Sequence, residues 1–174
     1  FEAEPLEILC LGKWSGLELG IRGDLDFVFL SDKQPNAKQI KMARRLVTII
    51  TSHSNAGRLY DIDLRLKPNE NAGPLILEKS QLFDFLKKSA EPWQKQAYLR
   101  SRLMGQSEFF LKDYYKELQI NQTELRSLQK ILSQLTRPSD TKKIHLKYGV
   151  GGLLHTEFIT QHACLMQKQP PSTP

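Results

Sequence analysis

The chain has 174 residues, of which 40% are hydrophobic and 25% are charged, and it carries a formal charge of +6 at pH 7. These proportions are ordinary for a globular protein and exclude fibrous, collagen-like and fully disordered chains. No apolar run approaches the roughly 20 residues that a membrane span needs, so we expect no membrane contact. Cys10 and Cys164 lie far apart in apolar contexts, which favours two buried thiols in a reducing compartment, the cytoplasm. Lys and Arg do not gather with aromatic residues into one block, which argues against nucleic acid as a partner.

The first half of the chain mixes strand and helix patterns. Residues 7–13 and 24–30 are β-type runs, separated by a glycine-rich loop. Residues 37–52 have apolar side chains at the spacing of an amphipathic helix. Residues 58–66 alternate polar and apolar side chains, which predicts a third strand, and residues 75–77 predict a short added strand.

The second half contains helical patterns alone. Ser80 is the predicted N-cap of a helix over residues 80–88. Further helices are predicted over residues 91–104, 107–118, 122–135 and 152–167. This order predicts an α+β fold, in which a small mixed sheet precedes an all-α segment. The expected division is a sheet module over residues 1–79, a helical segment over residues 80–168 and a frayed tail over residues 169–174.

The strongest local signal for chemistry is the pair Asp24 and Asp26 at the start of the second strand. Residues i and i+2 of a strand point to the same face, so the two carboxylates lie side by side while Leu25 and Phe27 point into the core. Like charges held together favour a bound cation, and hard ions such as Mg²⁺ take carboxylate oxygens. The plainer alternative is a pair of solvated carboxylates, which is the more common meaning of a bare Asp-x-Asp pattern.

The third predicted strand carries a second polar face. Asp61 and Asp63 alternate with apolar residues, and Arg65 and Lys67 continue on the same side. A third carboxylate on an adjacent strand can complete a site for two metal ions, and the two cations are suited to phosphates. The alternative here is a solvent-facing strand with charge pairs along it.

The glycine-rich loop between the first two strands is the third component. Gly12, Ser15 and Gly16 follow a strand, and a short helix is expected at residues 17–20. Backbone N–H groups in such a turn can bind a phosphate, although the loop matches neither a Walker A motif nor a dinucleotide fingerprint. Together, the loop and the carboxylates on two strands predict nucleotidyl transfer, with a triphosphate on the loop and metal ions on the carboxylates.

Four blocks of the sequence form a recognisable pattern. They are Leu11-Gly12-Lys13 with Ser15-Gly16, Glu18-Leu19-Gly20 and Asp24-Leu25-Asp26; Gly57 to Pro68; Trp93, Gln96, Ala97, Arg100 and Arg102; and Gly151-Gly152, Glu157-Phe158 and Gln161. In this order they resemble the glutamine synthetase adenylyltransferase family, within the polymerase-β-type nucleotidyltransferases. The resemblance covers roughly residues 8–165 and is closest to the adenylylating module of that family.

The resemblance implies a Mg²⁺-dependent nucleotidyltransferase that moves AMP from ATP onto a tyrosine of glutamine synthetase, or removes it by phosphorolysis. Asp24, Asp26 and Asp63 would be catalytic and would hold two Mg²⁺ ions. The implied ATP-binding residues are Gly12, Ser15, Gly16, Arg65 and Lys67, and the further candidates are Arg100, Arg102 and Glu157. A signalling regulatory protein is a second implied protein partner.

Five positions depart from the pattern of the family that the sequence resembles, namely Ser15, Gly23, Lys67, Gln94 and His155, and two of these departures bear on activity. Gly23 stands where Ser is usual before the Asp pair, and His155 stands where Asp is usual. These departures keep a second hypothesis open, in which a degenerate domain binds a nucleotide or a regulatory protein without turnover. A third hypothesis, a nucleotidyltransferase of the same fold acting on nucleic acid, needs a concentrated basic surface, and the sequence pattern does not predict one.

Overall fold

The computed structural model describes residues 5–21, 23–53, 55, 57–58, 60–69, 72–114, 120–138 and 145–168. Within these ranges the chain forms five strands and six helices, which confirms the predicted α+β class. The chain divides into two compact units, one within residues 1–90 and 100–110 and the other within residues 91–99 and 111–172. None of the described helices combines the length and apolar character of a membrane span. The tail predicted to fray lies outside the described residues.

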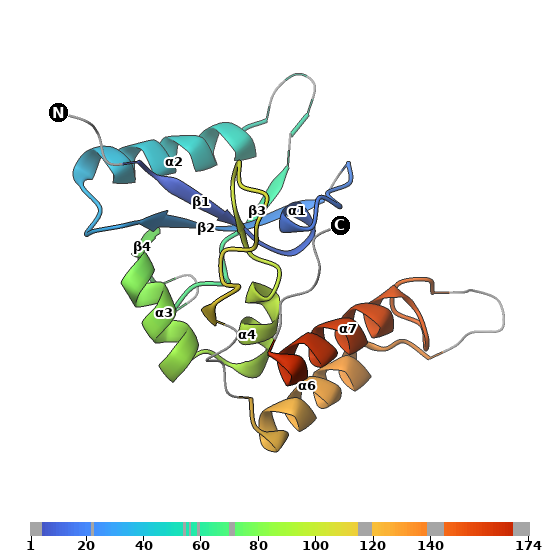
Figure 1. Ribbon diagram of the computed structural model, residues 1–174. Coiled ribbons are helices and arrows are strands. Elements are labelled where there is room, and N and C mark those ends of the chain that lie inside the picture. Colours follow the sequence, from blue (N-terminus) through green and yellow to red (C-terminus); the bar gives the residue numbers. More distant parts are fainter. Residues whose placement is uncertain are drawn as a thin grey trace. The chain divides into compact units, whose positions relative to one another are not determined.

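A five-stranded mixed sheet forms the centre of the first unit (Figure 1). Its strands are β1 (Glu7–Cys10), β2 (Asp24–Ser31), β3 (Asp61–Asp63), β4 (Ile76–Glu78) and β5 (Arg102–Leu103). The order is β3-β2-β1-β5, and β4 also pairs with β2. Because β2 runs antiparallel to β1 and parallel to both β3 and β4, this one strand fixes the positions of three others.

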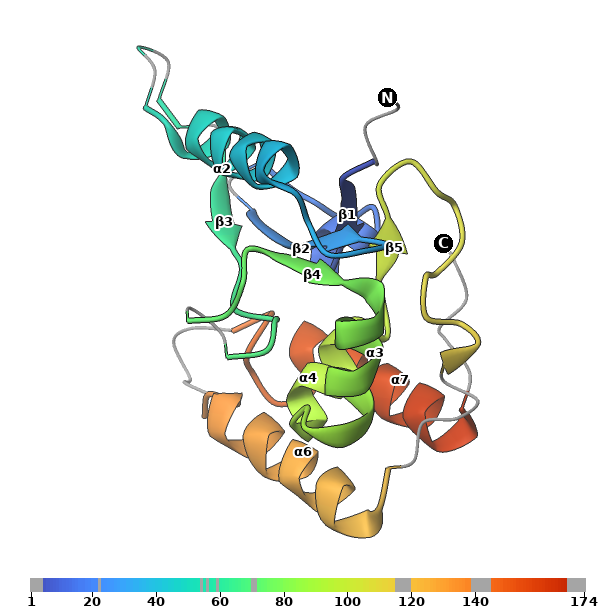
Figure 2. The same ribbon diagram turned by 90° about the vertical axis from the view of Figure 1, so that its left-hand side faces the viewer.

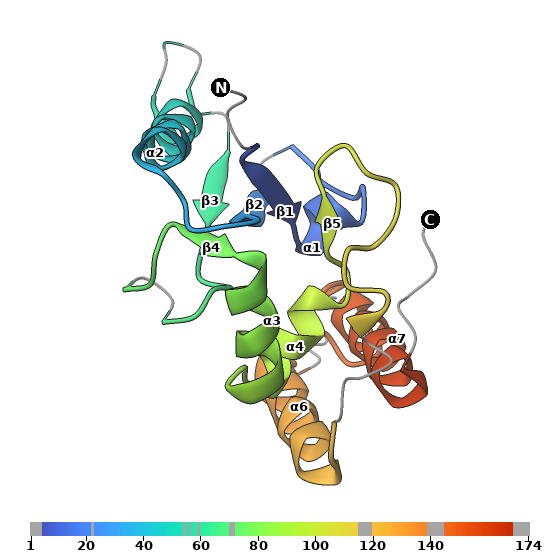
Figure 3. The same cartoon turned by 60° about the vertical axis from the view of Figure 1, so that its left-hand side comes forward.

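The central strand β2 is buried on both faces. Leu25, Phe27 and Phe29 pack in one hydrophobic cluster with the inner face of helix α2 (Ala37–Thr51), which lies along the sheet (Figure 3). Val28 and Leu30, which point to the opposite face, are buried as well. Full burial of a Leu or Phe side chain is worth about 1.5–3 kcal/mol, so β2 is a major source of the stability of this unit.

Helix α3 (Lys79–Lys88) follows β4 without a loop (Figure 2). Its N-cap is Glu78 rather than the predicted Ser80, because Glu78 and Gln81 form a capping box. The next residue, Lys79, forms ion pairs of 2.6 Å with Glu7 and 2.7 Å with Asp32. The N-cap therefore lies two residues before the predicted one, at a point fixed by the end of β4.

Two first-half elements are shorter than predicted, and one is misplaced. The strand expected at residues 7–13 ends at Cys10, because Gly12 has a φ of +52° and begins the short helix α1 (Gly12–Ser15). The helix expected at residues 17–20 is wrong, since Leu17 has a φ of +59° and ends the helical turn. The third strand is limited to β3.

The largest error concerns residues 91–104, which were expected to form one helix. Helix α4 (Pro92–Tyr98) ends early, and Arg102–Leu103 form strand β5 against β1. The edge of β1 has unpaired backbone groups, and pairing with β5 satisfies them. This demand arises from the fold and leaves no trace in side-chain periodicity. Of the helix predicted over residues 107–118, residues 107–113 form bends, turns and irregular backbone, and residues 115–118 lie outside the described residues.

The described helices of the second unit are α4, α6 (Gln122–Leu135) and α7 (Leu153–Gln167). The prediction for α6 is confirmed at both ends, and the prediction for α7 is confirmed to within one residue. Helix α6 begins at Asn121, whose side chain accepts a hydrogen bond from the backbone N–H of Glu124. These two ends were predictable because capping and helical spacing are local properties of the sequence.

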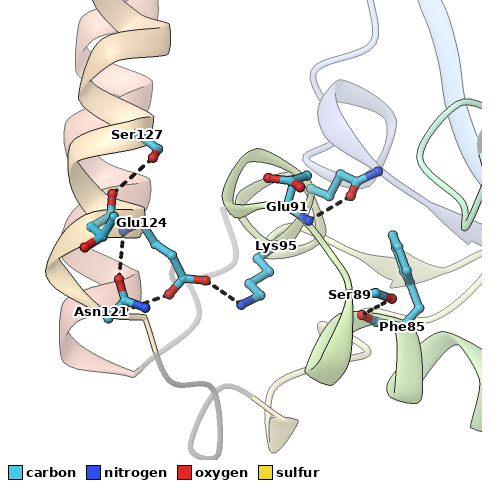
Figure 4. Close-up of polar contacts among 9 residues, drawn as sticks. Phe85, Ser89, Glu91, Lys95, Asn121, Glu124 and Ser127 are labelled. Atoms are coloured by element: carbon cyan, nitrogen blue, oxygen red, sulfur yellow. Dashed lines mark hydrogen bonds and ion pairs between the residues drawn. The ribbon is translucent and has the colours of Figure 1, made fainter.

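An ion pair joins α4 to α6 within the second unit (Figure 4). Nζ of Lys95 lies 2.8 Å from Oε1 of Glu124, and the two side chains are 11% and 20% exposed. Burial raises the pKa of Glu124, but the hydrogen bonds from Lys95 and from the N–H of Asn121 outweigh it, so the pKa is lowered overall. The carboxylate thus caps α6 and neutralises a half-buried amine at once.

Replacing Glu124 by Gln keeps the capping group but leaves Lys95 without its anion. We expect the free energy of unfolding at pH 7 to fall by about 1–2 kcal/mol. Because the pKa of Glu124 is lowered in the folded protein, the ionised carboxylate stabilises the fold at pH values above its ordinary pKa, and this stabilisation is lost as the pH falls through the folded pKa. Urea denaturation at pH 7 and pH 3.5 measures the free energy of unfolding with and without this stabilisation. The control Asp84→Asn, which breaks an exposed pair with Lys88, should cost less than about 0.5 kcal/mol; an equal cost would contradict the assignment.

Candidate nucleotidyl-transfer site

Two adjacent strands bring the predicted carboxylates together. Strands β2 and β3 are parallel, and their register places Asp24 opposite Asp61 and Asp26 opposite Asp63. Asp26 and Asp63 are half-buried, whereas Asp24 and Asp61 are exposed. Neighbouring strands lie about 4.8 Å apart, so the carboxylates of Asp26 and Asp63 are immediate neighbours. The predicted set of three therefore lies at one end of the sheet, where both strands begin.

The carboxyl group of Asp26 shows the electrostatic cost of this arrangement. Its pKa is raised to about 6, first because burial removes water from the charged form and then because Asp63 and Asp24 are negative. The positive charges of Arg65 and Lys13 lower the pKa without cancelling these effects. Further positive charge beside Asp26 would therefore stabilise its ionised form.

Asp63 differs from Asp26 because an arginine neutralises it. Nε of Arg65 lies 3.0 Å from each oxygen of the Asp63 carboxylate, and the Arg65 backbone N–H donates to one of them at 2.9 Å. The side-chain hydrogen bond from Arg65 is the main reason that the pKa of Asp63 is lowered. Arg65 thus lies beside the carboxylates, and its guanidinium is bound to Asp63.

The glycine-rich turn approaches Asp26 directly. A Cβ atom at Gly12 would lie 2.8 Å from Oδ2 of Asp26, and Gly12 has a φ of +52°. The N–H of Leu11 donates to the carbonyl oxygen of Asp26 at 2.9 Å. Position 12 therefore requires glycine twice, once for its left-handed backbone and once for the close approach to the carboxylate.

A second glycine of the turn makes room for an arginine. A Cβ atom at Gly16 would overlap a terminal nitrogen of Arg100, whose guanidinium lies over this glycine. The same guanidinium forms an ion pair of 2.8 Å with Glu18 and is 16% exposed. Arg102, on β5, directs a terminal nitrogen to the carbonyl oxygen of Trp14 at 3.4 Å. Both candidate arginines therefore lie against the turn.

Ser15 and Gly16 were expected to contact a phosphate, but their backbone amides are already hydrogen-bonded within the turn. The N–H groups of Ser15 and Gly16 donate to the carbonyl oxygens of Leu11 and Gly12, each at 3.1 Å. The side chain of Ser15 is 1% exposed, and its hydroxyl has no hydrogen-bond partner among the described residues. Amides of a first helical turn have no intrahelical acceptor, so those of residues 12–14 are the ones that the turn leaves for a ligand.

Two predicted residues have other partners in the structure. Lys67 is 7% exposed, and its Nζ donates to the carbonyl oxygens of Gly73 and Pro74 at 3.0 and 2.9 Å. Burial lowers the pKa of this amine, and the two bonds close the loop after β3. Lys67 would reach a phosphate only by giving them up. Glu157 is exposed on α7 of the second unit, where Nε2 of Gln161 donates to it at 3.2 Å.

The sequence matches a family model over residues 1–116, and that model is described as glutamate-ammonia ligase adenylyltransferase. The chain belongs to this family. A relative from Chromobacterium violaceum is 32% identical and covers 94% of the chain. Relatives from Idiomarina loihiensis and Bordetella pertussis are each 31% identical and cover 91% and 94% of it. All three are bifunctional glutamine synthetase adenylyltransferase/adenylyl-removing enzymes, and the chain spans only 19–20% of their length.

The three aspartates supply the donor chemistry that a hard divalent cation prefers, since all of their ligand atoms are carboxylate oxygens. As the side chains stand, no three His, Cys, Asp or Glu residues in the described part of the chain converge closely enough to hold a metal ion. The pairing of Asp63 with Arg65 explains this, because both carboxylate oxygens are already bound. The residues fit Mg²⁺ once Asp63 is released from Arg65.

Two residues of this site were given no role by the sequence. Lys13 lies in the turn and lowers the pKa of Asp26, and Glu18 binds Arg100. Both belong to the first block of the family pattern, so the block pointed to the correct stretch of chain. Their partners lie on other elements, and only the fold brings Arg100 to Glu18 across more than 80 residues.

Replacing Gly12 by Ala tests the close approach of the turn to Asp26. The left-handed backbone alone should cost about 1–2 kcal/mol of unfolding free energy, and the displaced carboxylate should add to this loss. The matched control is Gly20→Ala, because an added Cβ there meets nothing within 4 Å. We expect the control to change stability by less than about 0.5 kcal/mol in urea denaturation. Equal losses in the two variants would contradict the proposed geometry.

Replacing Asp26 by Asn should stabilise the metal-free protein at neutral pH. The folded pKa of about 6 lies above the ordinary value of 3.8, so ionisation of Asp26 costs the folded state free energy as the pH rises. In EDTA, we therefore expect Asp26→Asn to raise Tm at pH 7.5 and the gain to disappear as the pH falls below the ordinary pKa of 3.8, since Asp26 becomes protonated in both states. Asp84→Asn, which removes an exposed carboxylate, is the control and should show no such gain. A pH-independent effect would refute the raised pKa of Asp26 in the folded protein.

Proposed function

We propose that this chain is the transfer core of a Mg²⁺-dependent protein adenylyltransferase, which moves AMP from ATP onto a tyrosine of glutamine synthetase or removes it by phosphorolysis. The observation that carries the proposal is the register that sets Asp26 beside Asp63, with Asp24 on the same strand. The turn of residues 12–16, which approaches Asp26, lies beside them. The names of the relatives support glutamine synthetase as the acceptor.

In this proposal Asp24, Asp26 and Asp63 hold Mg²⁺, which when bound screens the charge of the triphosphate and of the leaving pyrophosphate. The tyrosine oxygen attacks the α-phosphorus in line, the bond from that phosphorus to the bridging oxygen breaks, and pyrophosphate leaves. Asp63, or a water beside it, accepts the proton of the tyrosine hydroxyl. The reverse direction uses phosphate as the attacking group and releases ADP, so the same carboxylates serve both.

Cations around the turn are suited to the triphosphate. Lys13 and Arg65 both act on the charge of Asp26, and Arg100 lies over Gly16. Arg65 has a second role in this scheme, because its release from Asp63 makes one carboxylate and one guanidinium available together. We propose that a nucleotide and Mg²⁺ bring about this exchange, since phosphate oxygens replace the carboxylate as the arginine's acceptor.

A second candidate function is a nucleotide-sensing or protein-interaction module without turnover, and the Arg65–Asp63 pairing favours it. His155, which stands where the family usually has Asp, is also used structurally. Its Nδ1 accepts from the N–H of Gly151 at 2.9 Å, and its Nε2 lies 2.8 Å from the hydroxyl of Thr136. This histidine therefore joins the two ends of the α6–α7 connection. The module would bind ATP without transferring AMP.

Calorimetric titration with ATP, with and without Mg²⁺, tests the proposal. We expect Mg²⁺-dependent binding that is lost in Asp24→Asn/Asp26→Asn and in Asp63→Asn, with AMP transfer to glutamine synthetase reduced on the order of 10²–10³-fold. Asp61→Asn is the matched control, because Asp61 lies two residues from Asp63 on the same strand, is exposed and forms an ion pair with Arg58. It should bind ATP normally.

Each outcome of this titration has a distinct meaning. Metal-dependent binding without transfer in the wild-type chain would favour the sensing module. Equal loss in the Asp61 and Asp63 variants would mean that general charge, and not the predicted ligand set, supports binding. No binding of ATP by the wild-type chain would refute the transferase and the nucleotide sensor and would favour a protein-interaction module.

A further inference from the structure

The positive charge of the chain is concentrated in one segment. Between Asp32 and Asp61 the sequence contains six Lys and Arg residues and no Asp or Glu. This segment alone accounts for the formal charge of +6, and the rest of the chain is balanced. These cations do not form a dense basic block in the sequence, because apolar and amide residues separate them along the chain.

Helix α2 gathers four of these cations on its outer face. They are Lys38, Lys41, Arg44 and Arg45, and all four are exposed. None of them forms an ion pair or a side-chain hydrogen bond with a described residue. The inner face of α2 packs in the hydrophobic cluster, so the cations point away from the sheet. We call these four residues the basic face of α2.

The basic face works against the stability of its own helix. Lys38 and Lys41 are three residues apart, and Lys41 is three and four residues from Arg44 and Arg45, so neighbouring side chains repel one another. No carboxylate on the helix compensates, whereas the exposed Lys88 of α3 pairs with Asp84 one turn away. A repulsive, unpaired face of this kind is suited to a negatively charged partner.

The cations lie between Lys38 and Arg45 of α2, and the rest of the helix leads from them toward the end of the sheet that carries Asp24 and Asp61. Helix α2 connects β2 to the parallel strand β3, so it runs back from the end of β2 to the level at which both strands begin. Asp24 and Asp61 lie at those beginnings. A partner bound along α2 therefore has part of its surface at the end of the sheet that carries the candidate site.

We propose that the basic face of α2 docks an acidic surface of the protein that accepts the adenylyl group, which rests on the proposed function above. Exposed apolar side chains flank the cations, since Met42 is 52% and Ile49 is 54% exposed, and such mixed patches are typical of protein interfaces. The helix has no aromatic residue on which a base could stack. A lipid surface would need the apolar face of α2, which is packed on the sheet.

The test compares two charge reversals with the same i, i+4 spacing. Lys41→Glu/Arg45→Glu reverses the basic face, and Arg126→Glu/Lys130→Glu reverses two exposed cations of α6 that have no assigned role. Binding of each chain to immobilised glutamine synthetase is measured by surface plasmon resonance at 50 and 200 mM salt. We expect Kd to rise about tenfold for the α2 variant, mainly through slower association, and to change less than about twofold for the α6 variant. The wild-type affinity should fall with salt.

Mg²⁺-dependent ATP binding is measured on the same variants, because it separates the docking proposal from the proposed function. Unchanged ATP binding with lost glutamine synthetase binding in the α2 variant supports docking. Equal binding of glutamine synthetase by both variants, or no binding by a wild-type chain that still binds ATP, overturns docking and leaves the nucleotide site intact. Charge-dependent binding to an RNA oligonucleotide or to phosphatidylglycerol vesicles, with glutamine synthetase binding unaffected, overturns it in favour of those partners.

Discussion

The parallel pairing of β2 with β3 is the constraint on which the candidate site depends. It holds Asp26 beside Asp63 although both are acidic and half-buried, and the raised pKa of Asp26 reports the cost. The hydrophobic core offsets this unfavourable free energy. Strand β2 cannot shift its register without removing Leu25, Phe27 and Phe29 from the hydrophobic cluster. The carboxylates are therefore held together at one end of the sheet, where a bound cation would relieve their repulsion.

The elements around the carboxylates are shaped by the same requirement. Gly12 allows the turn to approach Asp26, and Gly16 allows the guanidinium of Arg100 to lie over that turn. The site is thus a balance between three carboxylates and nearby cations, with Arg65 bound to Asp63 in the present arrangement. Exchanging partners in such a cluster needs only side-chain movement, since the backbone positions are fixed by the sheet. The backbone of the site is therefore fixed by the sheet, whereas the ion pairs between its side chains can change.

Much of this was available from local sequence patterns. The period-2 alternation around Asp24 and Asp61 predicted which residues share a face, and the capping and spacing signals predicted α6 at both ends. The patterns failed where a distant partner decides the outcome. β5 forms because β1 offers an unpaired edge, and Lys67 turns to the carbonyls of Gly73 and Pro74 because the loop folds back over it. Neither interaction alters the spacing of side chains along the chain.

The sequence by itself determined the chemistry of this protein: which carboxylates alternate on strands, where glycine permits a tight turn, and the order of blocks that marks the family. The tertiary structure alone decided the pairings, including Asp26 beside Asp63, Arg65 on Asp63, Arg100 over Gly16 and the exposure of the basic face of α2. The reason is physical. Residue type and local periodicity are written in neighbouring positions, whereas charge balance and burial depend on groups that only folding brings within a few ångströms of one another.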